Sequence, residues 1–114
     1  MTAGKYDIVV EKGAQFERTL TITSSGGEFD SGISSHTFQS MIRENYGDAS
    51  PAVTLQTSIS DGANGVLLLL IPSSTTDAIT IGGGVWDLEA VRNSDSEVIR
   101  LLEGEVIIKQ SATK

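Results

Sequence analysis

The chain has 114 residues, close to the commonest size of a single domain, and no cysteine, which excludes disulfides, thiolate nucleophiles and cysteine-ligated zinc. Its 15 acidic residues outnumber its 8 basic ones and give a formal net charge of −7. Such a chain repels phosphate backbones and anionic lipid, so we expect neither nucleic acid nor a membrane as partner.

The N-terminal residues show no targeting signal, because residues 1–7 contain one lysine and no apolar stretch. The longest apolar run, residues 66–71, is far too short to span a membrane. The sequence therefore predicts no signal peptide and no transmembrane segment. It favours a protein that is made in the cytoplasm and stays there or is assembled there into something larger.

The first part of the chain alternates between apolar and polar residues with the period of a half-buried strand, over residues 6–11 and 16–23. A short glycine-containing connection separates these two strands. The side chains expected to face the core are Tyr6, Ile8, Val10, Phe16, Leu20 and Ile22.

The middle of the chain begins with an irregular stretch, residues 28–35, that we expect to wrap the sheet edge with Phe29 and Ile33 as plugs. A strand follows over residues 36–44, with Phe38 and Ile42 expected to face the core, and another strand over residues 53–59. The sequence from Asp61 to Gly65 holds Asp-Gly and Asn-Gly, which are hairpin turn signals, although it also resembles part of an oxygen-ligand loop. We favour the turn.

The last part begins with the apolar strand 66–71, which Pro72 ends. Residues 72–79 have room for one short helical turn with Ser73 or Ser74 as its cap. A strand over 85–92 and a long final strand over 97–110 then form a hairpin. The first of these places Trp86, Leu88 and Ala90 on one face, and this is the face we expect to be buried.

Seven or eight short strands, with turns every 8–12 residues, predict an all-β fold, a mainly antiparallel β-sandwich. No linker, internal repeat or low-complexity block divides the chain. We therefore expect a single domain over residues 1–114, with residues 1–4 and 111–114 frayed.

Residues that carry chemistry are scarce. His36 is the only histidine, and it has neither a nucleophile elbow nor the nitrogen or sulfur partners of a zinc site. Gly82 to Gly84 lack the lysine and hydroxyl of a phosphate loop. We therefore predict no catalytic residue, no cofactor-binding residue and no metal ligand, and so a protein that is not an enzyme.

Acidic residues gather on the predicted C-terminal hairpin, where Asp87 and Glu89 share one strand face and Glu103 and Glu105 share a face of the next. A Ca²⁺ site or an acid/base pair would need such carboxylates. A solvated acidic face, with Arg92 and Arg100 as cross-strand partners, needs no further ligand and is the interpretation we favour. The alternatives remain open at this point.

One strand does not fit a simple sandwich, because residues 66–71 are apolar on both faces. If Val66, Leu68 and Leu70 face the core, then Leu67, Leu69 and Ile71 face outward and need a cover. That cover is either residues 73–81 of the same chain or another subunit. We therefore name Leu67, Leu69 and Ile71 as a candidate interface.

Two motifs are the most specific part of a family resemblance that runs over nearly the whole chain. They are Gly84-Val85-Trp86-Asp87-Leu88-Glu89 and Val98-Ile99-Arg100-Leu101-Leu102-Glu103-Gly104-Glu105-Val106. The sequence resembles small tail- or baseplate-associated structural proteins of phages and prophages. The resemblance implies an immunoglobulin-like sandwich, similar to N-terminal domains of baseplate upper proteins. Relatives usually carry tyrosine in place of Trp86.

The resemblance also implies a non-enzymatic virion protein in a tail, baseplate or fibre-attachment position. Its partners would be other virion proteins and copies of itself in a homo-oligomer. A head decoration protein is one alternative, and a carbohydrate-binding module that uses Tyr46 or Trp86 is another. A small hydrolase that uses the acidic hairpin is the least favoured, because no nucleophile or base is identifiable.

Overall fold

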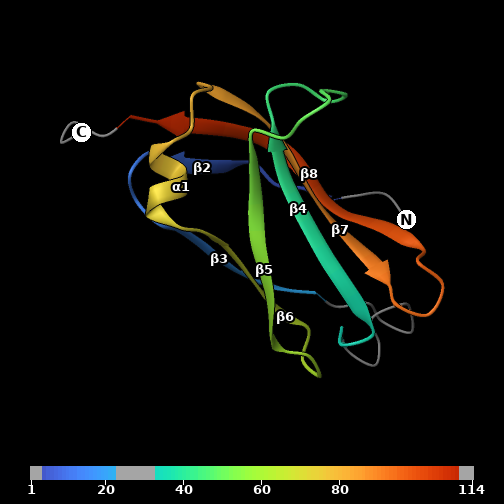
Figure 1. Ribbon diagram of the computed structural model, residues 1–114. Coiled ribbons are helices and arrows are strands. Elements are labelled where there is room, and N and C mark those ends of the chain that lie inside the picture. The colour runs from blue at the N-terminus through green and yellow to red at the C-terminus, as the bar shows by residue number, and fades with distance from the viewer. Residues whose placement is uncertain (1–3, 23–32, 111–114) are drawn as a thin grey trace.

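The computed structural model describes residues 4–22 and 33–110. Figure 1 shows that these residues form mostly strands, with a short helix after the strand Val66–Ile71. The strands are β1 (Gly4–Lys5), β2 (Ile8–Glu11), β3 (Phe16–Thr21), β4 (His36–Arg43), β5 (Val53–Asp61), β6 (Val66–Ile71), β7 (Gly83–Arg92) and β8 (Val98–Lys109), and the helix is α1 (Ser73–Asp77). The expected all-β fold with one helical turn is confirmed.

The strands form one strongly curled sheet in the order β1-β8-β7-β4-β5-β6-β3, with β2 also pairing with β8 (Figure 1). Strand β5 belongs to both layers of the resulting sandwich. Its first residues, Val53 to Leu55, pair with β4, and its later residues, from Gln56 onward, pair with β6. A strand that changes layers in this way lets one continuous sheet enclose a core from two sides.

The N-terminal strands depart from the expected antiparallel pattern. Both β1 and β2 run parallel to β8, with Gly4 opposite Leu102 and Ile8 opposite Val106. Every other strand pair is antiparallel. Gly4, which we expected to be frayed, is therefore part of a strand, while residues 1–3 and 111–114 lie outside the described part of the chain.

The core lies between the two layers and is built from the inward face of each strand. Most of the predicted inward residues are buried, namely Ile8, Val10, Phe16, Phe38, Ile42, Trp86, Leu88 and Ala90, and Leu20 and Ile22 are partly buried against them. Ile33 is fully buried, as its predicted role as a plug requires. Tyr6 is 38% exposed, so its inward assignment is wrong. Phe29 lies outside the described residues.

Strand β6 has the opposite orientation to the one we expected. Leu67, Leu69 and Ile71 are at most 1% exposed and belong to the core, whereas Val66, Leu68 and Leu70 are half-buried on the outer side. The candidate interface of Leu67, Leu69 and Ile71 is therefore wrong. A strand that is apolar on both faces carries no signal for which face is buried.

Helix α1 closes one end of the sandwich beside the β2–β3 turn (Figure 1). Thr76 is fully buried there, and its hydroxyl Oγ1 donates to the carbonyl of Ala14 and accepts from the N–H of Gly13. The expected serine cap is wrong, because the N-cap position is Pro72 and makes no side-chain capping bond. The helical turn α1 is therefore held in place by the hydrogen bonds of the buried Thr76 and not by a side-chain cap.

Candidate functional site

The outward face of the β8-β7-β4 sheet carries the largest group of interacting polar side chains that the structure describes. Alternation along β7 buries Trp86 and Leu88 and turns Asp87 and Glu89 outward. Strand register then sets their neighbours. Glu103 lies opposite Asp87 on β8, and residues of β4 lie opposite both acids on the other side.

A β-bulge in β8 completes this group. Leu88 pairs with Leu102, but the next residue, Glu89, pairs with Arg100, so β8 has one extra residue at this point. Residues three apart on a regular strand point to opposite faces. The bulge instead brings Arg100 and Glu103 to the same face.

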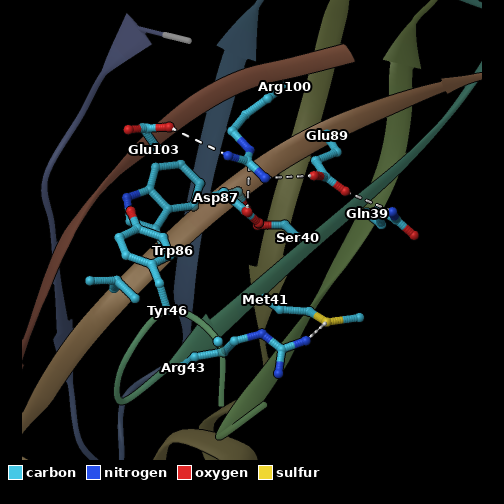
Figure 2. Close-up of a pocket in the computed structure, with 12 residues that line it drawn as sticks. Gln39, Ser40, Met41, Arg43, Tyr46, Trp86, Asp87, Glu89, Arg100 and Glu103 are labelled. Carbon is cyan, nitrogen blue, oxygen red and sulfur yellow. Dashed lines mark hydrogen bonds and ion pairs between the residues drawn. The ribbon is translucent and has the colours of Figure 1, made fainter. Parts of the chain in front are cut away.

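Arg100 is the centre of the group, as Figure 2 shows. Its guanidinium nitrogens lie 3.3 Å from Glu89, 3.6 Å from Asp87 and 3.9 Å from Glu103. Glu89 in turn accepts a 2.9 Å hydrogen bond from the Gln39 amide of β4. One arginine therefore connects three carboxylates, and the network extends across three strands.

The sequence interpretation of a solvated acidic face with Arg100 as a cross-strand partner agrees with this geometry. Arg92, the other suggested partner, pairs with Asp95 in the hairpin turn at 2.8 Å. Glu105 is exposed on the same side of β8, and none of the ion pairs at this cluster includes it. Exposed ion pairs of this kind contribute about 0–1 kcal/mol each, so the cluster shapes a surface more than it stabilises the fold.

Burial and the neighbouring charges raise the pKa of two groups at this cluster. Burial, followed by the negative charge of Glu89, raises the pKa of the Asp87 carboxyl, although Arg100 and Arg43 act in the opposite direction. Burial and the charges of Glu103 and Asp87 also raise the pKa of the Tyr46 phenol. Tyr46 is therefore a neutral hydrogen-bonding group at physiological pH and not a base.

A shallow hollow of about 620 Å³ lies over this cluster. Its wall combines charged side chains with less polar ones. The charged ones include Asp87, Arg100 and Glu103, and the others include Gln39, Met41 and Tyr46. Figure 2 shows these side chains projecting from β4, β7, β8 and the loop that follows β4. Tyr46 is 57% exposed, so an aromatic ring is available at the edge of the hollow.

Exposed apolar side chains lie farther along the same sheet face. Val9 of β2 and Ile107 of β8 are directly opposite in the parallel pair, and they are 43% and 57% exposed. Alternation along β8 places Ile107 on the same side as Glu103. The outward face therefore presents a charged hollow at its centre and an uncovered apolar pair at its edge.

The other sequence candidates do not join this face. His36 is buried, and its Nδ1 lies 3.1 Å from the Ser35 hydroxyl. Asp61 accepts bonds from the side chain and N–H of Asn64, which lower the pKa of its carboxyl, so the predicted turn is confirmed. In residues 4–22 and 33–110, no three histidine, cysteine or acidic side chains converge as metal ligands would.

Trp86 is 1% exposed and belongs to the core, as predicted, so it does not serve as a surface platform. Its ring Nε1 donates a 2.6 Å hydrogen bond to the carbonyl of Tyr6. The sequence interpretation missed the contribution of β4, whose outward residues Gln39, Met41 and Arg43 lie along one side of the hollow. The alternation that identified Phe38 and Ile42 as buried also marks these residues as outward.

Comparison with known proteins supports the fold alone. No family model matches the sequence, and no curated protein matches it. Among solved structures, the chain is similar to the NK cell receptor NKp44, with a TM-score of 0.54 and 10% identity over 96% of this chain and 100% of that chain. The fold is immunoglobulin-like.

A structure of VGSC beta subunits is also similar, with a TM-score of 0.48 and 7% identity over 97% of this chain and 96% of that one. The similarity to NKp44 confirms the expected immunoglobulin-like sandwich. An immunoglobulin-like fold hosts many functions, so function has to be argued from the surface. Across the described ranges, no helix is long and apolar enough to cross a membrane.

Proposed function

We propose that this protein is a non-enzymatic structural component that acts through protein–protein contacts on the outward face of β8, β7 and β4. The observation that carries the proposal is the hollow over Arg100, where charged, aromatic and apolar side chains share one exposed sheet face. Arg100 engages Asp87, Glu89 and Glu103 together, so each of these three carboxylates already has a cationic partner. Such a face is suited to docking rather than to proton transfer.

The residue types of this face support contact with another protein. Tyrosine, methionine and arginine are enriched at protein interfaces. Tyr46, Met41, Arg43 and Arg100 all line the hollow. The exposed Val9–Ile107 pair adds uncovered apolar area on the same sheet face.

The proposed setting is a phage or prophage virion, in a tail, baseplate or fibre-attachment position. The support is the sequence resemblance, whose two most specific motifs fall on β7 and β8. These are the strands that build the hollowed face. The proposed partners are therefore other virion proteins and copies of this chain, with head decoration as the alternative position.

Particles purified from cells that encode this chain test the setting. Mass spectrometry of intact particles is expected to find the chain in a fixed ratio to the tail proteins, after nuclease and high-salt washing. Presence of the chain in tail-less heads would instead identify it as a head decoration protein. Absence from every purified particle would refute the virion proposal.

A second candidate function is carbohydrate binding, which the exposed ring of Tyr46 beside the polar hollow favours. Aromatic rings commonly stack on apolar faces of ligands, and the surrounding amide and carboxylates can accept or donate hydrogen bonds. A glycan array tests this reading directly. Glycan binding that is abolished by Tyr46→Ala would support the carbohydrate-binding function. An array on which no glycan binds would rule that function out.

A further inference from the structure

The outer edge of β3 is unpaired among the residues that the structure describes. In an eight-stranded order that ends in β3, its one strand neighbour is β6. The N-terminal strands β1 and β2, which precede β3 in the chain, pair with β8 instead. An unpaired edge presents backbone N–H and C=O groups to any strand that fits.

The register identifies which backbone groups face that edge. The N–H of Ile22 donates to the carbonyl of Gly65 at 2.7 Å, in line with the β3–β6 register. Bonding groups alternate along an antiparallel strand, so the alternate residues Phe16, Arg18 and Leu20 also bond toward β6. The N–H and C=O groups of Glu17, Thr19 and Thr21 therefore point away from β6, and these three residues are exposed.

We propose that this edge pairs with the same edge of a second copy of the chain, antiparallel and centred on Thr19. Thr19 then lies opposite Thr19, and Glu17 lies opposite Thr21. All three free residues find partners, and threonine pairs of this kind are favourable in sheets. The proposal concerns a different surface from the hollowed face and does not depend on the proposed function.

Charge disfavours the registers that are displaced toward the start of β3. Pairing centred on Arg18 would set two arginines opposite each other, and pairing centred on Glu17 would oppose two carboxylates. Arg18 itself is directed inward, opposite Leu69, with its guanidinium 4.9 Å from the centre of the Phe16 ring. Inward charges discourage indiscriminate edge pairing, and in the Thr19-centred register each Arg18 lies opposite Leu20, so the two arginines do not face each other.

Sedimentation velocity tests the pairing. The wild-type chain is expected to form a dimer whose fraction rises with concentration, and Thr19→Lys is expected to yield monomers with an unchanged circular dichroism spectrum. Ser58→Lys is the matched control, because Ser58 is also exposed on a strand of the same layer but is separated from the outer edge of β3 by strand β6. A wild-type monomer at all concentrations, or a dimer that Thr19→Lys leaves intact, would overturn the proposal.

Cross-linking tests the register, since the chain has no cysteine of its own. A mixture of Glu17→Cys and Thr21→Cys chains is expected to give a mixed dimer with a short bis-maleimide, whereas Glu17→Cys alone gives none. Cross-linking of Glu17→Cys alone would contradict the Thr19-centred register. Particles that incorporate the chain while it remains monomeric would reject the edge pairing and leave the proposed function standing.

Discussion

At the scale of single residues, Trp86 joins the N-terminal strands to the central sheet. Its ring is buried, meets the Tyr6 ring edge-on at 6.2 Å, and donates its N–H to the Tyr6 carbonyl. Gly104 lies opposite Trp86, and a Cβ at that position would come within 2.2 Å of the same carbonyl. One backbone carbonyl thus depends on a tryptophan donor and on a glycine that gives it space.

Trp86→Phe is expected to destabilise the fold by about 1–3 kcal/mol, because it removes the donor and leaves the part-buried Tyr6 carbonyl without that bond. Urea denaturation followed by far-ultraviolet circular dichroism measures the change. Gly104→Ala is expected to lower the denaturation midpoint as well, through the clash with the Tyr6 carbonyl. Unchanged midpoints for both variants would contradict the described packing.

Asp87 gives a pH dependence with a definite sign. The pKa of the Asp87 carboxyl is raised in the folded chain. The folded chain therefore binds a proton at Asp87 more tightly than the unfolded chain does, in which the pKa of this carboxyl is about 3.9. The contribution of Asp87 to stability is therefore present below about pH 4 and is lost as the pH rises through the folded-state pKa. Asp87→Asn is expected to gain stability relative to wild type, by less than about 1 kcal/mol, between about pH 4 and pH 7. Thermal melts across this range that show the opposite trend would contradict the assignment.

At the scale of elements, β6 and β8 show where sequence periodicity stops being informative. Alternation identified the buried faces of β4 and β7, because polar residues mark the opposite face. In β6 both faces are apolar, so only the pairing with β3 and β5 decides which face is buried. In β8 the bulge places Arg100 and Glu103 on the same face, although they are three residues apart. Strict alternation in the sequence gives no sign of such an extra residue.

The orientation of β6 makes adjacent leucines unequal. Leu69→Ala is expected to cost about 2–5 kcal/mol, because Leu69 is fully buried and the change leaves a cavity. Leu68→Ala is expected to cost clearly less, since Leu68 is half-buried on the outer side. Chemical denaturation of the two variants makes the comparison. Equal costs would contradict this orientation of β6, and a larger cost at Leu68 would indicate the reverse one.

At the scale of the whole molecule, composition and turn spacing were sufficient to predict the fold class. Strands β2 to β8 and the short helical turn were all expected, and β1 was not. The sequence did not reveal the parallel pairing of β1 and β2 with β8, because pairing partners far apart in sequence leave no local pattern. It predicted the acidic hairpin with Arg100. It missed the hollow, which forms only when β4 lies beside β7.

The central proposal is that the hollowed face docks other proteins of a particle, and charge reversal at Arg100 tests it most directly. Arg100→Glu places a fourth carboxylate among Asp87, Glu89 and Glu103, whereas Arg92→Glu makes the same charge change at the end of β7. The measurement is the amount of each variant in purified particles relative to wild type, for chains with matching circular dichroism spectra. The account predicts at least a tenfold loss for Arg100→Glu and wild-type incorporation for Arg92→Glu, and equal incorporation of both variants would contradict it.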